Sequence, residues 1–182
     1  MLTSADLLQT AHYVLDLESE SLKLLSDSLD DSFVQAVNAI NAAKGRVVIT
    51  GMGKSGHVGR KIAASLSSLG TTAYFVHPGE ASHGDLGMIE PDDIVIALSN
   101  SGEAPELGDI IAFCRRFGIK IIGMTGKRDS TLGRQSDVVL CLPPIKEACP
   151  FGMAPTTSTT LMMALGDALA IALLKMHNFS KD

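Results

Sequence analysis

The chain has 182 residues, a formal net charge of −5, 46% hydrophobic residues and no tryptophan. A chain of this length can bury one sizeable hydrophobic core. The chain is acidic and poor in aromatic side chains, which argues against nucleic acid as its main ligand, because nucleic acid binds basic faces and stacks on aromatic rings. The three cysteines, Cys114, Cys141 and Cys149, lack the spacing of metal ligands, and the N-terminus lacks the basic and apolar regions of a signal peptide. We therefore expect one domain over residues 1–182, in a cytoplasmic protein that holds no metal.

Apolar residues recur at helical spacing in the N-terminal part of the chain, which predicts one helix over 4–27 and a second over 31–43. In the second helix, Phe33, Val37 and Ile40 are expected to face inward. The two helices together carry more leucine than a solvent-facing pair needs. Because unpartnered apolar stripes favour symmetric packing, we expect a homo-oligomer.

Five short runs rich in β-branched and apolar residues follow: "RVVIT", "TAYFV", "DIVIALS", "IKIIGMT" and "DVVLCL". Such continuous runs are typical of strands buried on both faces of a parallel sheet. Helical segments over 55–69, 104–117 and 130–135 separate the strands, and a last helix is predicted over 157–176. The alternation predicts a three-layer α/β/α sandwich with a five-stranded parallel sheet, in an α/β core of residues 45–179.

The last helix contains the longest apolar stretch, "TTLMMALGDALAIALLKM". Gly166 and Asp167 interrupt it before it reaches the roughly 18 apolar residues that a membrane span needs. We therefore expect a buried core helix and no membrane partner.

The turn "GMGKSG" after the first predicted strand indicates a phosphate site of some kind. A P-loop is rejected, because that motif needs a glycine five residues before Gly53, where the chain has Val48. The three glycines do fit the dinucleotide fingerprint. That fingerprint also needs an acidic residue at the end of the second strand to hold the ribose, and the chain has His77 and Pro78 there. A plain tight turn explains the glycines equally well.

Three hydroxyl-rich segments precede predicted helices, and ligands of such folds bind beyond the carboxyl ends of the strands. Hydroxyls and backbone N–H groups at helix N-termini bind phosphate well, whereas a helix cap alone needs only one hydroxyl. In the second segment, Gly102 is expected to open a helix. The predicted phosphate-binding residues are Gly53, Ser55, Ser99, Asn100, Ser101, Gly102, Thr156, Thr157 and Ser158.

The segments "GMGKSG", "SNSGE" and "TTSTT" in this order resemble the sugar isomerase (SIS) domain. "HPGEASHGDLGM" together with "KEACPFGMAPT" resembles more closely the bacterial D-arabinose-5-phosphate isomerases of the KpsF/GutQ type, over about Gly45–Phe179. The resemblance implies a flavodoxin-like topology. It also implies interconversion of D-ribulose 5-phosphate and D-arabinose 5-phosphate through an enediol, without a cofactor, in the supply of Kdo for lipopolysaccharide.

The resemblance places Lys54, His83, Glu106 and Glu147 in the active site. Moving a proton between C1 and C2 needs a base, and it needs help for the charge on the carbonyl oxygen. Lys54 suits the second task and either glutamate the first. A general base is expected to have its pKa raised by a dry pocket.

The resemblance also implies a homotetramer built from two dimers, with sites at the subunit interfaces. Relatives of this type continue into a histidine-bearing segment and a pair of CBS modules, which these 182 residues do not include. We therefore expect this form to bind sugar phosphate but to turn over poorly. A non-catalytic sugar-phosphate-binding module is the main alternative, and a nucleotide-dependent oxidoreductase is weakened by the missing ribose acid.

Overall fold

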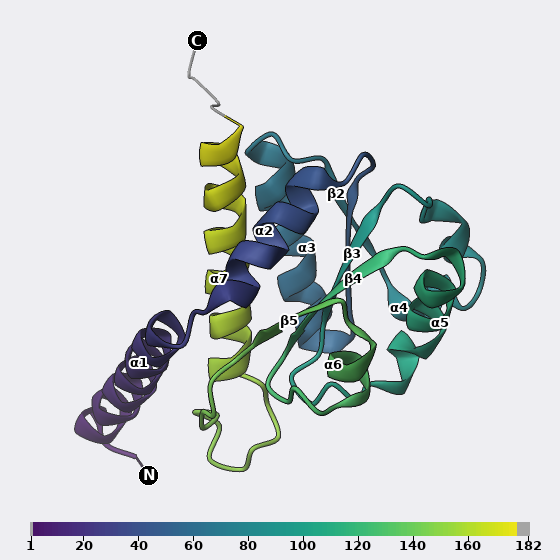
Figure 1. Ribbon diagram of the computed structural model, residues 1–182. Helices are drawn as coiled ribbons and strands as arrows, with labels where there is room; N and C mark the ends of the chain where they lie inside the picture. The colour runs from purple at the N-terminus through teal and green to yellow at the C-terminus, as the bar shows by residue number, and fades with distance from the viewer. Residues whose placement is uncertain (1, 178–182) are drawn as a thin grey trace.

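The computed structural model, which describes residues 2–177, is built around one five-stranded sheet (Figure 1). Every strand pair is parallel, and the strand order is β2-β1-β3-β4-β5. The predicted sandwich is confirmed, and this order is the flavodoxin-like one. The predicted boundaries at residues 179 and 182 lie outside the described residues. The strands are β1 (Val47–Gly51), β2 (Ala73–Val76), β3 (Ile94–Leu98), β4 (Lys120–Thr125) and β5 (Val138–Cys141).

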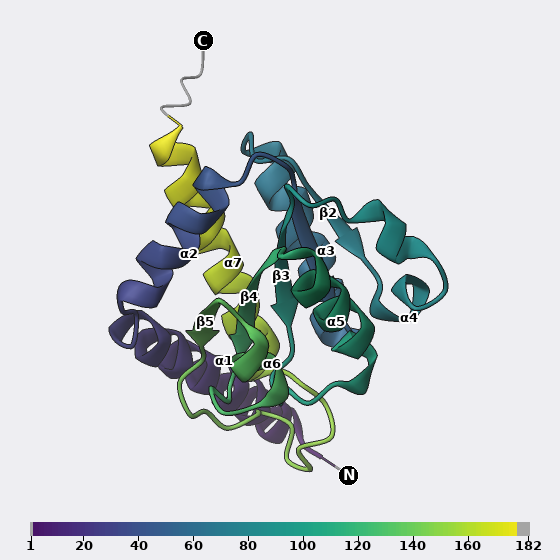
Figure 2. The same ribbon diagram turned by 45° about the vertical axis from the view of Figure 1, so that its right-hand side comes forward.

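Helices cover both faces of the sheet, as Figure 2 shows from the side. One face packs against α2 (Asp31–Ala42), α3 (Gly53–Ser68) and α7 (Thr157–Met176), and α1 (Ser4–Asp27) lies against α7 with Leu25 in the same core. The other face packs against α4 (Pro78–Ala81), α5 (Gly108–Phe117) and α6 (Thr131–Gln135). Successive side chains of a strand point to opposite faces, so Val47 and Ile49 join the first core and Val48 joins the second.

The two N-terminal helices begin at well-formed caps. The Thr3 hydroxyl accepts from the Asp6 amide, and the Asp30 carboxylate accepts from the Ser32 amide. The inward positions of Val37 and Ile40 are confirmed, and Phe33 packs half-buried against the same core. Helix α1, in contrast, leaves a row of leucines exposed on its own surface: Leu7 at 57%, Leu8 at 64% and Leu15 at 64%.

Helix α7 is a core helix, although by length and composition alone it is long and apolar enough to cross a membrane. The expectation that Gly166 and Asp167 exclude it on composition was therefore wrong. Half of its most apolar window is buried inside the protein. Gly166 packs so close to α3 that a Cβ there would lie 2.4 Å from Ile62, so this glycine allows close helix packing.

The structure differs from the sequence prediction around two loops. The helix predicted over 104–117 is divided into a short 3₁₀ turn, η2 (Pro105–Leu107), and α5. Gly102 does not open a helix. It sits in a turn with φ +67°, and Pro105 disfavours helical backbone in the residue before it. After β2, α4 and a second 3₁₀ turn, η1 (Asp85–Met88), occupy a segment for which no helix was predicted.

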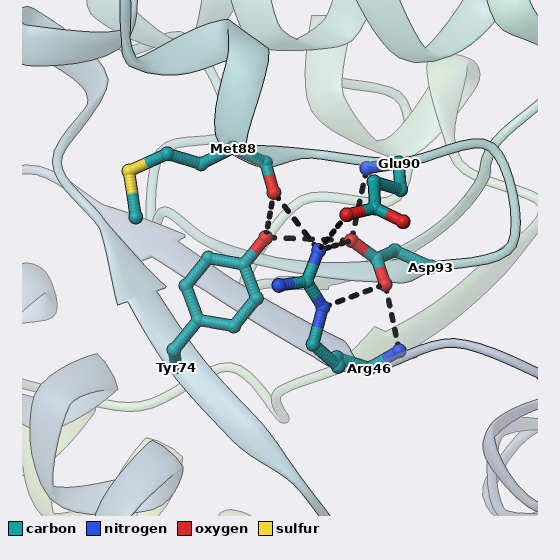
Figure 3. A network of polar contacts seen from close by, with 5 residues as sticks. All are labelled: Arg46, Tyr74, Met88, Glu90 and Asp93. Carbon is teal, nitrogen blue, oxygen red and sulfur yellow. Dashed lines mark hydrogen bonds and ion pairs between the residues drawn. The ribbon is translucent and has the colours of Figure 1, made fainter.

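At the edge where β1 and β3 begin, one buried carboxylate organises a polar network (Figure 3). Asp93 accepts hydrogen bonds from the Arg46 amide at 2.7 Å, the Arg46 guanidinium at 3.0 Å and the Glu90 amide at 2.9 Å. The Tyr74 hydroxyl donates to the Met88 carbonyl, and the Arg46 guanidinium lies 4.8 Å from the centre of the Tyr74 ring. Burial raises the pKa of Asp93, but the hydrogen bonds from Arg46 and Glu90 outweigh it and hold the pKa below its usual value.

Candidate functional site

The candidate site lies beyond the carboxyl ends of β1 and β3, which are neighbours in the sheet. The connections from β1 and β3 leave in opposite directions, so this is the topological switch point where ligands of such folds bind. The register pairs Gly51 with Leu98, so the turns that follow these two residues start side by side. Two of the three predicted phosphate segments therefore meet here. The third precedes α7, which packs along α3.

The β1–α3 turn presents the start of a long helix without a side-chain cap. Met52 occupies the N-cap and makes no side-chain capping bond, which leaves first-turn amides for a ligand or for water. Lys54 is exposed, and the half-buried Ser55 hydroxyl lies 3.9 Å from the Met162 sulfur on α7. A Cβ on Gly56 would lie only 2.5 Å from the Gly51 carbonyl oxygen. Tight packing of helix on strand therefore accounts for glycine at position 56 without a dinucleotide.

The β3–η2 turn is held together by its own serines. The buried Ser99 hydroxyl accepts from the Gly102 amide at 3.1 Å, and the exposed Ser101 hydroxyl accepts from the Glu103 amide at 3.2 Å. A Cβ on Gly102 would lie 1.9 Å from the Ser130 hydroxyl, so the turn rests directly on the β4–α6 loop. Each serine accepts within the turn and keeps a hydroxyl proton that it can donate to a ligand.

Glu147 is placed by the loop between β5 and α7, and its carboxylate faces the first residues of that helix. Its Oε2 accepts from the Thr156 amide at 2.8 Å, from the Thr156 hydroxyl at 3.1 Å and from the Ser158 amide at 3.3 Å. Burial raises the pKa of Glu147, but hydrogen bonding by Ser158 and Thr156 outweighs it and lowers the pKa below its usual value. The expectation of a raised pKa is therefore wrong for Glu147.

The four predicted catalytic residues lie on two sides of the same sheet edge. Lys54 and Glu147 belong to segments on the α3 and α7 side. His83, in the turn between α4 and η1, and Glu106, in η2, are exposed in segments that pack on the α5 side. Within residues 2–177, no hydrogen bond or ion pair joins any two of the four. The assignment of all four to catalysis stays a prediction.

Two observations on the described residues concern a resident metal or dinucleotide. No cluster of three or more His, Cys, Asp or Glu side chains there could hold a metal ion. Where a dinucleotide would need its ribose carboxylate, the His77 ring instead accepts from the Gly79 amide and caps α4. That no metal or cofactor is used remains a prediction.

The contacts of Thr156 and Ser158 differ from those that the sequence pattern predicted. Both were predicted as phosphate ligands, and both bond Glu147, nine and eleven residues earlier in the chain. The hydroxyls of Thr157 and Ser158 are buried and have no partner among the described residues. The one sequence signal was the run of hydroxyl residues before an apolar helix. That run indicates that the helix start binds an anion, but it does not distinguish a phosphate from a carboxylate of the protein.

The fold and the loops at its switch point define an α/β protein of the sugar isomerase class. The family model described as "SIS domain" matches residues 39–172. The chain therefore belongs to the SIS domain family, and the predicted resemblance is confirmed.

Two curated relatives are similar over nearly the whole chain. The chain is 51% identical over 177 residues to arabinose 5-phosphate isomerase KdsD of Yersinia pestis, which covers 97% of this chain and 54% of the relative. It is 49% identical over the same length to KdsD of Escherichia coli strain K12, again with 97% and 54% covered. The chain thus spans about half the length of the curated relatives that it matches.

A solved structure matches the fold closely. An Escherichia coli CFT073 protein in complex with A5P superimposes with a TM-score of 0.95 and 35% identity, over 99% of this chain and 96% of that one. The Vibrio vulnificus NanR protein, complexed with ManNAc-6P, matches with a TM-score of 0.77 and 22% identity, over 93% of this chain and 62% of that one. The second likeness shows the shared fold alone.

Proposed function

We propose that the chain is the isomerase domain of an arabinose 5-phosphate isomerase, which interconverts D-ribulose 5-phosphate and D-arabinose 5-phosphate. The observation that carries the proposal is the meeting of the β1–α3 and β3–η2 turns at the switch point, with Lys54 in the first turn. Identity of 51% to a curated isomerase of this name supports the substrate. The A5P bound to the Escherichia coli CFT073 protein supports the same ligand.

The phosphate is expected to lie over the start of α3 and against Ser99, Asn100 and Ser101. Backbone N–H groups and hydroxyl protons converge there on a dianion, and the positive end of the α3 dipole favours it. The sugar then extends from the phosphate toward the charged side chains at the sheet edge.

The reaction is a proton transfer between adjacent carbons. A carboxylate, Glu147 or Glu106, takes the proton from C2 of the aldose, and the carbonyl oxygen at C1 gains a proton to give the enediol. Return of a proton to C1, with loss of the proton on O2, gives the ketose. Lys54 would stabilise the negative charge that develops on the oxygens, a role typical of a cation next to an enolate.

The assembly and cellular context belong to the same proposal. Exposed leucines on α1 and the exposure of Lys54, His83 and Glu106 support a homotetramer of two dimers with sites completed at subunit interfaces. Three free cysteines support a reducing, cytoplasmic compartment. Supply of arabinose 5-phosphate for Kdo in lipopolysaccharide is the expected use.

Proton exchange with solvent tests the proposal directly. Incubation with arabinose 5-phosphate in D₂O, with no cofactor added, should place deuterium at C2 of the recovered aldose and form ribulose 5-phosphate. D-arabinose without phosphate is the matched control substrate and should show neither. Absence of both deuterium exchange and ribulose 5-phosphate would overturn the proposed isomerase activity.

The same experiment separates the alternative. A non-catalytic sugar-phosphate-binding module would bind arabinose 5-phosphate in calorimetry yet leave C2 free of deuterium. The separation of the four predicted catalytic residues across two sides of the sheet edge is the observation that supports this second candidate.

A further inference from the structure

The start of α7 lacks a capping side chain of its own. Thr156 occupies the N-cap without making a side-chain capping bond, although a 20-residue helix leaves its first amides unpaired. The Glu147 carboxylate fills this place from the preceding loop, through the bonds to the Thr156 amide and hydroxyl and to the Ser158 amide. An anion from the protein itself therefore occupies the positive end of the helix.

The Thr156 hydroxyl has both of its hydrogen-bonding roles in use. It donates to Glu147 at 3.1 Å and accepts from the Ala148 amide at 2.9 Å. It therefore ties the carboxylate and the next residue of the loop to the helix start at the same time. The hydroxyls of Thr157 and Ser158, both buried, are out of reach of a phosphate arriving from solvent.

A phosphate at this helix start would have to displace the carboxylate or sit beside it. Two anions at hydrogen-bond distance from the same amides repel each other, and no cation pairs with Glu147 among the described residues. Among the described residues no carboxylate accepts from the first-turn amides of α3, and the one carboxylate of the β3–η2 turn, Glu103, accepts from Thr131 instead, so these two turns are the better place for the phosphate.

We infer that the start of α7 holds the Glu147 carboxylate for catalysis and is not a phosphate site, so that Thr156 and Ser158 are positioning residues. This inference rests on the proposed isomerase function, in which Glu147 is a candidate base. It reassigns Thr156, Thr157 and Ser158, which composition had placed among the phosphate ligands.

The arrangement also fixes the charge state of Glu147. Hydrogen bonds to the ionised form lower the pKa against the effect of burial, so the carboxylate is in its base form at neutral pH. The titratable neighbours on its own loop are Lys146 and Cys149, and the first turn of α7 carries no charged side chain. No charged side chain from another element is among the groups that shift this pKa.

Kinetics of three variants test the inference. Thr156→Val removes the hydroxyl and should lower kcat about tenfold, the cost of one hydrogen bond to a charged group, while KM for arabinose 5-phosphate stays within about twofold. Thr156→Ser keeps the hydroxyl and should restore kcat. Thr160→Val is the matched control, because its hydroxyl bonds only the Thr156 carbonyl within the helix, at 3.2 Å. A raised KM with unchanged kcat in Thr156→Val would overturn the inference.

A second measurement does not depend on activity. Carbon-13 NMR of glutamate-labelled protein, with Glu147→Gln to assign the signal, should show the Glu147 pKa below its usual value in the wild type and higher in Thr156→Val. Binding of inorganic phosphate should be equal in wild type and Thr156→Val. A wild-type Glu147 pKa at or above the usual value would overturn the inference even if the variant folds poorly. Weaker phosphate binding in a Thr156→Val protein whose melting temperature shows that it is folded would overturn it as well. Failure of the wild type to isomerise would instead count against the proposed function alone.

Discussion

The two edges of the sheet use polar side chains in opposite ways. Where the strands begin, Asp93 has a side chain only 1% exposed, Arg46 and the Glu90 amide donate to it, and the Tyr74 hydroxyl lies 3.3 Å from it. Where the strands end, Lys54 and Ser101 are exposed and Ser99 is buried, and no described residue accepts the hydroxyl protons of the two serines. At the first edge the hydrogen bonds stabilise the fold, whereas at the second edge the donors are available to bind a ligand.

The difference follows from the cost of buried polar groups. A carboxylate as buried as Asp93 is tolerable only when partners surround it, since a buried charge without them costs several kcal/mol. Donors at the open edge are hydrated and cost little until a phosphate replaces the water. The comparison therefore predicts that substitutions at one edge change stability and those at the other change catalysis.

Lys54→Met should have the largest effect. Removing the cation expected beside the reacting oxygen should lower kcat about 10²–10³-fold, as removal of one transition-state donor does elsewhere, with little change in the melting temperature. Initial rates and thermal unfolding are the measurements. Lys61→Met, on the same helix and paired with Asp167, is the control that should keep its activity. Equal rates in both variants would remove Lys54 from the mechanism.

Asp93→Ala should come next, and it should act on stability. Breaking the buried pair should lower the free energy of unfolding by about 3 kcal/mol, at the low end for such pairs because Arg46 is 37% exposed and can be hydrated. Urea unfolding measures this. Asp92→Ala, at the exposed neighbouring position, should change it little. A large loss of kcat in folded Asp93→Ala would contradict the division between the edges.

Ser99→Ala and Ser101→Ala should weaken binding more than they slow chemistry. Each loses a hydrogen bond to a charged phosphate, worth about 1.5–3 kcal/mol, so KM for ribulose 5-phosphate should rise about tenfold or more. Ser68→Ala, at the opposite edge where α3 ends, should leave KM unchanged. Unchanged affinity in both turn variants would show that phosphate is held elsewhere.

Tyr74→Phe should have the smallest effect on the free energy of unfolding, and this effect should depend on pH. Burial and the nearby Asp93 charge raise the pKa of Tyr74 to about 12, above its usual value of 10.0. The protonated hydroxyl therefore stabilises the folded state fully below pH 10, and this contribution is lost as pH rises from 10 toward 12. Urea unfolding should show wild type more stable than Tyr74→Phe by about 1 kcal/mol at pH 8, with the difference shrinking above pH 10. A pH-independent difference would mean that the hydroxyl does not titrate with the network.

The polar turns that form the candidate site could be predicted from sequence because strand ends are local features. Runs such as "DIVIALS" mark a buried strand, and the polar residues after it must then lie at one edge of a parallel sheet. The start of α5 was misplaced because Pro105 and the turn at Gly102 compete with helical periodicity. The role of Thr156 was missed because its partner lies across an irregular loop.

The amino-acid sequence by itself determined the alternation of strands and helices, the five strands and the polar turns that follow them, because each depends on the order of neighbouring side chains. The prediction that all five strands are buried on both faces was wrong for the two edge strands, β2 and β5, whose residues are mostly half-buried. Tertiary structure alone decided which of those turns meet. Parallel pairing of β1 with β3 brings the residues after Gly51 beside those after Leu98, and it joins Arg46 to Asp93 across 47 positions. Folding of the β5–α7 loop likewise places the Glu147 carboxylate at the start of α7. Such contacts form between distant segments once burial has packed the sheet, so no local pattern records them.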